Sequence, residues 1–151
     1  MNTSDSKYTL DLSEEDYQKA TVEVAFLLDA FASTIDNIMG GNTAPVGRIA
    51  GRDTASKLPV NISDPTLQSI IHELQKLMHS GFDFTLDDSG LRFKGCIIRD
   101  MCNLRKIETG GALCRLFHSY FDGIVNGLLY RPVKSAIIST GDECRIQTAI
   151  Q

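Results

Sequence analysis

Four cysteines and one histidine are the side chains of this chain best suited to bind a metal ion. His118 follows Cys114 by four positions, which places both on one side of the helix that we predict there. A thiolate and an imidazole can share a metal ion, as zinc and haem sites show. Cys96 and Cys102 follow a predicted strand, and we expect them to meet Cys114 at one end of the sheet. The candidate metal ligands are Cys96, Cys102, Cys114 and His118, with zinc or haem as the cofactor.

The phase of the predicted strands limits this metal site. Cys144 shares its side of the last strand with Ile146, which assigns it to the hydrophobic core. Cys96 shares its side with Lys94, which assigns it to the solvent face unless Gly95 carries a β-bulge. No two cysteines have the C-x2-C spacing of a structural zinc site, and buried free cysteines are common in proteins. The cysteines are therefore either metal ligands or ordinary core residues.

Cys114 also has features of a reactive thiol. It lies at the expected start of a helix and next to Arg115, and both neighbours would lower its pKa. Catalysis by Cys114 and His118 would further need a side chain that orients the histidine, and the sequence indicates none. We therefore assign no catalytic residue and regard the chain as more consistent with a binding protein than with an enzyme.

The predicted helix of residues 112–128 carries an apolar stripe that begins with aromatic side chains. Such a stripe either packs into a core or lines an elongated pocket for a small apolar ligand. The sequence leaves both alternatives open. The candidate ligand-binding residues are Phe117, Tyr120, Phe121 and Ile124.

Several elements must position these residues. Apolar periodicity and capping residues predict helices, whereas period-two alternation around turn residues predicts hairpins. Residues 99–111 are expected to be irregular. The order of elements predicts an α+β fold, in which N-terminal helices pack on a four-stranded antiparallel sheet and a long helix separates two hairpins. The expected helices cover residues 13–39, 44–58, 66–79 and 112–128, and the hairpins cover 82–94 and 133–150.

Length and composition exclude several classes of protein. The chain has 151 residues, of which 42% are hydrophobic and 23% charged, so we expect one globular domain over residues 13–151 after a flexible segment of residues 1–12. A net charge of −4 argues against a nucleic-acid partner. The polar start predicts no secretory signal, and we expect no membrane span. These features indicate the cytoplasm, where cysteines stay reduced.

The last forty residues contain three motifs: Cys114 with Phe121-Asp-Gly-Ile-Val-Asn-Gly-Leu-Leu, Arg131-Pro-Val, and Gly141-Asp-Glu-Cys144-Arg-Ile. These motifs resemble the 4-vinyl-reductase-like, or hydrocarbon-binding, domain family. In that family a cysteine precedes a helix with a G-I/L-x-x-G-L-L pattern, and a G-D-x-x-C-R turn precedes the last strand. Cys96 and Cys102 also resemble family cysteines, and Gly47-Arg-Ile-Ala-Gly-Arg52 is similar to its small-residue helix.

The resemblance implies a fold similar to that of core subunits of the transport-protein-particle tethering complex. Domains of this family are usually dimeric and have a hydrophobic tunnel in the interior. The resemblance also implies a homodimeric binding or sensor domain for a small apolar ligand. Zinc-binding relatives take a glutamate and a cysteine from the strand before the G-D turn. Residues 134–137 are Lys-Ser-Ala-Ile and lack both, so that zinc site is not expected. The alternatives are an enzyme or auxiliary factor of tetrapyrrole or cofactor metabolism that uses Cys114 and His118, and a dimeric scaffold.

Overall fold

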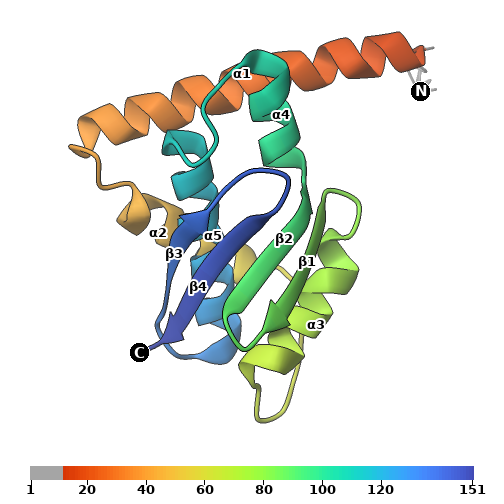
Figure 1. Ribbon diagram of the computed structural model, residues 1–151. Coiled ribbons are helices and arrows are strands. Elements are labelled where there is room, and N and C mark those ends of the chain that lie inside the picture. The colour runs from red at the N-terminus through yellow and green to blue at the C-terminus, as the bar shows by residue number, and fades with distance from the viewer. Residues whose placement is uncertain (1–11) are drawn as a thin grey trace, which may run out of the picture.

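The computed structural model describes residues 12–151, which form an α+β fold with five helices and one four-stranded antiparallel sheet (Figure 1). This confirms the predicted fold class. Residues 1–11, most of the expected flexible segment, lie outside the described residues. The helices are α1 (Glu14–Ile38), α2 (Ala44–Ala55), α3 (Leu67–Met78), α4 (Ile97–Arg105) and α5 (Ala112–Leu129). The strands are β1 (Phe82–Asp87), β2 (Gly90–Cys96), β3 (Val133–Ser139) and β4 (Cys144–Ile150), in the spatial order β1-β2-β4-β3.

Local sequence explains where the first helices begin and end. The Ser13 hydroxyl accepts a hydrogen bond from the backbone N–H of Asp16 at 3.2 Å, and the Asp16 carboxylate accepts one from the backbone N–H of Ser13 at 3.0 Å. Thr66 and Ser69 form the same reciprocal cap on α3. Gly40 and Gly41 follow α1 with φ values of +62° and +85°, which glycine adopts easily. Both predicted helix starts are confirmed.

Helix α1 packs on the domain through small residues and exposes its large ones. It crosses one end of the molecule above α4 and the start of α5 (Figure 1). Only Ala25 and Ala32 are buried, whereas Val24, Phe31 and other large apolar side chains are exposed. The large apolar residues that recur at helical spacing along α1 predict a buried face, and this prediction is wrong, because the helix is buried at Ala25 and Ala32 instead.

Glycines bring α2 and α5 into close contact. A side chain at Gly51 would overlap the backbone of Tyr120 and Gly123, and one at Gly123 would overlap the backbone of Arg48. Gly127 faces the methyl group of Ala55. The close helix packing that small residues predict is thus confirmed, and it fixes the position of α2 against α5.

The core consists of two clusters. The larger one lies between the sheet, α3 and α5 and contains Phe84, Phe93 and Phe121. The smaller one lies between α1, α4 and the start of α5 and contains Cys102 and Cys114. Phe117 packs against both clusters, so the start of α5 marks their boundary.

Residues 97–105 form α4, so the prediction of an irregular segment from Arg99 to Gly111 is wrong over this part. Charged residues interrupt the apolar pattern there, yet the helix buries Ile98, Arg99, Met101 and Cys102. Cys102 therefore lies on a helix rather than in a loop. None of the helices within residues 12–151 has the length and apolar character that crossing a membrane requires.

Candidate functional site around His118

His118 lies between two cavities on the side of α5 that faces the sheet. One cavity is enclosed and mostly apolar, and the other is open and polar. Helix α5 supplies side chains to both cavities. Cys114, His118 and Asp122 follow one another at intervals of one turn, so they lie along the same face of the helix. The ring of His118 packs edge-on against Phe93 of β2, with 5.3 Å between the ring centroids.

The enclosed cavity lies at the boundary of the two core clusters. Its volume is about 10 Å³, which leaves room for one water molecule at most. Apolar side chains form part of its wall, including Phe93, Phe117 and Ile137. The rest comes from residues with chemical function, among them Cys96, Cys114, His118, Arg99 and Cys144.

The predicted metal ligands share one end of α5 without forming a ligand set. Cys96, Cys114 and His118 line the enclosed cavity, whereas Cys102 is fully buried on α4 beside Cys114. Over residues 12–151, no three or more His, Cys, Asp or Glu side chains are grouped closely enough to hold a metal ion. The donor chemistry suits zinc, but this geometry does not fit it, and binding of zinc or haem stays a prediction.

Burial keeps Cys96, Cys102 and His118 uncharged at neutral pH. It raises the pKa of the Cys96 thiol, and together with Cys114 it raises the pKa of Cys102 to about 12. Burial also lowers the pKa of His118 to about 4. Cys96 and Cys102 are therefore thiols rather than thiolates, which disfavours both metal ligation and nucleophilic attack by them.

A β-bulge turns Cys96 into the core. The pairing of β1 with β2 joins Asp83 to Gly95 and Phe84 to Phe93, so that it skips Lys94. The extra residue reverses the alternation, and Cys96 is 7% exposed. The exception stated for Cys96, a β-bulge at Gly95, therefore applies, and the core assignment of Cys144, which is also 7% exposed, is confirmed.

Arg99 stabilises this bulge from α4. Although charged, it is only 7% exposed. Its guanidinium donates hydrogen bonds to the carbonyl oxygens of Lys94 at 2.8 Å and Phe93 at 3.3 Å, and it lies 3.8 Å from the sulfur of Cys144. No sequence pattern indicates this role, because Arg99 stands next to Asp100 in a segment with other charged residues.

The predicted ligand-binding stripe is divided between the core and the cavity wall. Phe121 and Ile124 are buried in the larger core cluster, where Phe121 packs edge-on against Phe84. Tyr120 faces α2 and donates a hydrogen bond to the Thr54 hydroxyl at 3.2 Å. Phe117 lines the enclosed cavity and stacks on Phe82, with 4.8 Å between the ring centroids. Of the four predicted residues, Phe117 alone borders either cavity at His118.

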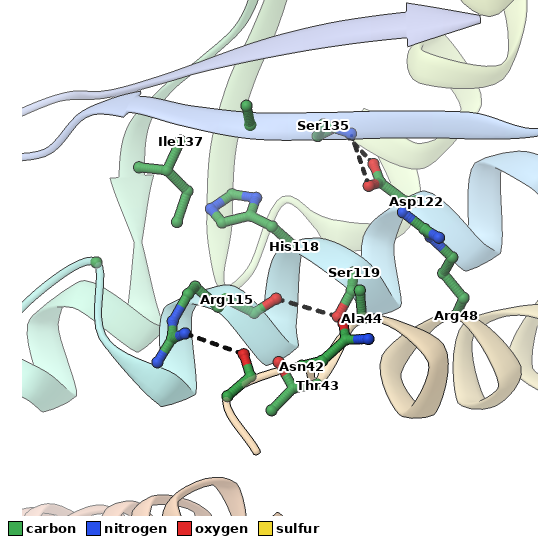
Figure 2. Close-up of a pocket in the computed structure, with 13 residues that line it drawn as sticks. Asn42, Thr43, Ala44, Arg48, Arg115, His118, Ser119, Asp122, Ser135 and Ile137 are labelled. Carbon is green, nitrogen blue, oxygen red and sulfur yellow. Dashed lines mark hydrogen bonds between the residues drawn. The ribbon is translucent and has the colours of Figure 1, made fainter. Parts of the chain in front are cut away.

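The polar cavity lies between α5, β3 and the segment that connects α1 to α2 (Figure 2). Its volume is about 420 Å³, within the range of small-molecule sites. Arg48 reaches it from α2 and Arg115 from α5, and Ile137 forms an apolar part of the wall. No sequence pattern predicts this group of residues, because they come from three separate segments of the chain.

Asp122 is the buried acid of this cavity. It is 3% exposed, and it accepts hydrogen bonds from the backbone N–H of Ser135 at 2.9 Å and from the Ser135 hydroxyl. Burial raises the pKa of Asp122 to about 6, against the smaller opposing effects of Ser135 and the Arg48 charge. The sequence does contain one signal for Asp122, because an acidic residue stands there within an otherwise apolar helical segment.

Comparisons of the chain with protein-family models, curated proteins and solved structures find no match. The resemblance to the 4-vinyl-reductase-like family therefore stays a prediction, as does the function that it implies. The α+β fold, the enclosed thiol-lined cavity and the polar cavity do not depend on that resemblance.

Proposed function

We propose that this chain is a non-catalytic binding or sensor domain that works as a homodimer and takes up a small apolar ligand beside α5. The proposal keeps the resemblance to the 4-vinyl-reductase-like domain, and it places the protein in the cytoplasm, where its four free cysteines stay reduced. The observation that carries the homodimer is the exposed apolar side of α1, and the enclosed cavity beside Phe117 supports the ligand site.

Seven residues of α1 follow the spacing of a coiled-coil seam; Thr21 and Ile35 are half-buried and the others are exposed. Phe26 and Leu27 are also exposed and lie outside this seam. Steps of four and three residues alternate along the helix, as at the a and d positions of a heptad repeat. Within this seam Val24 is 50% exposed, Phe31 58% and Ile38 76%. Monomeric proteins rarely leave such a continuous apolar surface in water. The seam consists of Tyr17, Thr21, Val24, Leu28, Phe31, Ile35 and Ile38.

A second copy of the chain fits this seam better than a lipid surface does. A two-fold axis would place two identical seams against each other and cover both in one contact. Helix α1 contains six acidic residues and one lysine, a charge that anionic lipid would repel. The charge thus disfavours anionic lipid, and the heptad spacing favours a protein partner.

Light scattering on the purified protein tests the dimer. We expect the mass of two chains for the wild type and of one chain for Phe31→Glu, because the new charge lies in the seam. Ala30→Glu adds the same charge at the neighbouring exposed position outside the seam and should stay dimeric. A wild type with the mass of one chain at about 10 µM would exclude the proposed homodimer.

The boundary between the two core clusters supports uptake of an apolar ligand. An enclosed cavity already exists there, and Phe117 separates it from the stacked ring of Phe82. Its present volume requires Phe117 to move before a ligand enters. Such movement would also alter the contact of Phe117 with Phe121, whose ring centroid lies 6.3 Å away.

Fluorescence titration with N-phenylnaphthylamine tests this site. We expect saturable binding by the wild type and stronger binding by Phe117→Ala, in which the cavity is larger. Leu128→Ala removes a comparable side chain farther along α5 and should bind as the wild type does. If neither the wild type nor Phe117→Ala binds the probe, this part of the proposal is wrong.

The non-catalytic character follows from the surroundings of His118. A histidine base needs a partner that orients it, and the nearby Asp122 carboxylate binds Ser135 instead of the imidazole. Replacing Cys114 and His118 together should leave any activity of the protein unchanged. Loss of a turnover with retained folding would favour the enzyme of cofactor metabolism over the binding domain.

A further inference from the structure

The polar cavity contains one buried hydrogen-bond donor that no acceptor within the described residues uses. The Nε atom of Arg48 is buried and has no hydrogen-bond partner within residues 12–151. A buried donor without a partner costs free energy that a bound acceptor would recover. Arg48 therefore marks a place for a hydrogen-bond acceptor.

The nearest acid does not take up this donor. Arg48 extends toward Asp122 along the cavity wall (Figure 2). Asp122, however, directs both carboxylate oxygens to Ser135, one to its backbone N–H and one to its hydroxyl. Arg48 influences Asp122 through its charge. The guanidinium thus remains available to a ligand.

A second positive group lies across the cavity from Arg48. Arg115 is held by Asp36 at 3.3 Å and by the carbonyl oxygen of Gly41 at 3.4 Å, and these contacts fix its guanidinium at the wall. Its side chain is still 45% exposed, so it keeps donors for a ligand. The two arginines provide a clamp of the kind that recognises carboxylates and phosphates.

The start of α2 completes the cavity. Thr43 is the N-cap residue, and its side chain caps no backbone N–H of the helix. The N–H of Ala44 therefore lacks a partner within the helix at the wall of the cavity, where the helix dipole is positive. Neutral His118 and the side chain of Ile137 supply a less polar wall opposite.

We propose that this polar cavity binds a small organic molecule with an oxyanion group, held between Arg48, Arg115 and the start of α2. The cavity of about 420 Å³ accommodates a compact organic acid or a small phosphate ester. The site is distinct from the enclosed apolar cavity, and it depends neither on the dimer nor on apolar ligand uptake.

Titration calorimetry together with amide NMR spectra tests this site with benzoate, inorganic phosphate and benzamide as probes. We expect saturable binding of benzoate or phosphate with a dissociation constant below about 1 mM, and shifts of the Ala44, Ser119 and Ser135 amides. Benzamide has the shape of benzoate without its charge and should not bind. Tighter binding of phosphate would assign a phosphate group to the ligand, and tighter binding of benzoate a carboxylate.

Arginine variants decide whether the binding occurs in this cavity. Arg48→Met should weaken binding of the oxyanion about tenfold or more, and Arg115→Gln should weaken it independently of Arg48. Arg52→Met removes an exposed arginine one turn farther along α2, outside the cavity, and serves as the matched control. Equal affinities of Arg48→Met, Arg115→Gln and Arg52→Met, or no saturable binding by the wild type, would overturn the proposal.

Discussion

His118 and Asp122 lie one turn apart on α5, line the same polar cavity, and are both shifted by burial toward their neutral forms. Burial lowers the pKa of the histidine from 6.5 to about 4 and raises the pKa of the acid from 3.8 to about 6. The two shifts act on stability in opposite directions over the same range of pH. Replacing either residue should leave the pH dependence of the free energy of unfolding that the other residue causes.

Asp122→Asn should raise the free energy of unfolding relative to the wild type, and this difference should grow as pH rises. Below about pH 4 the carboxyl group is protonated in both states and imposes no penalty. Between about pH 4 and 6 the unfolded chain ionises first, so the wild type loses about 3 kcal/mol that the asparagine variant retains. Urea unfolding across this range measures the difference. Asp88→Asn changes an exposed acid in the turn between β1 and β2 and should follow the wild type.

His118→Gln should have the opposite effect. Above about pH 6.5 the histidine is neutral in both states. As pH falls toward about 4, the unfolded chain takes up the proton first, and the wild type loses about 3 kcal/mol that the glutamine variant retains. Urea unfolding curves at about pH 4.5 and 7 measure this change. Parallel pH profiles of the wild type and both variants would show that neither pKa is shifted.

Arg99→Met should destabilise the protein by about 2–3 kcal/mol, because it removes the charged donor from the carbonyl oxygens of Phe93 and Lys94 at the bulge. Arg145→Met replaces an exposed arginine on β4 and should change the free energy of unfolding by less than about 0.5 kcal/mol. Chemical unfolding measures both. Equal effects of the two substitutions would contradict the bridging role of Arg99.

The fold could be predicted where one local pattern determines each element. Ser13 and Thr66 mark helix starts through their own capping groups, and the alternation after Phe82 specifies a hairpin. Helix α4 escaped prediction because its buried side includes Arg99, whose carbonyl partners lie in another element. The orientation of Cys96 depends on a bulge that Gly95 makes possible and that the pairing of β1 with β2 decides.

The candidate site could be predicted only in part. The cysteines and His118 are visible as residue types, and four of these five side chains do line one cavity. The polar cavity depends on how α2 docks on α5, which places Arg48 near Asp122 and Ser135. No spacing in the sequence encodes that contact. The apolar residues of the α1 seam recur at helical spacing in the sequence. This spacing predicts a helix, but it does not tell whether the apolar face packs on the domain or remains exposed.

Gly127→Ala should destabilise the contact between α2 and α5, and Ala55→Gly should restore it. A methyl group at Gly127 would lie 2.6 Å from the Ala55 methyl carbon, which forces the helices apart. Overpacking of this kind costs about 1–3 kcal/mol, and the second substitution removes the clash. A double-mutant cycle by urea unfolding should show a favourable coupling of about 1 kcal/mol or more between the two sites. Additive effects would mean that the helices do not approach so closely.

All four cysteine thiols should react slowly in the folded protein. Each is 9% exposed or less, and burial raises the pKa values of Cys96 and Cys102, so few thiolates are accessible. With Ellman's reagent at about pH 8, we expect no rapid phase from the native wild type and four reactive thiols in concentrated guanidinium. Ser80→Cys places a thiol at an exposed position after α3 and should add one rapid equivalent. A rapid phase of one equivalent in the wild type itself would show that a thiol of the enclosed cavity is open to solvent.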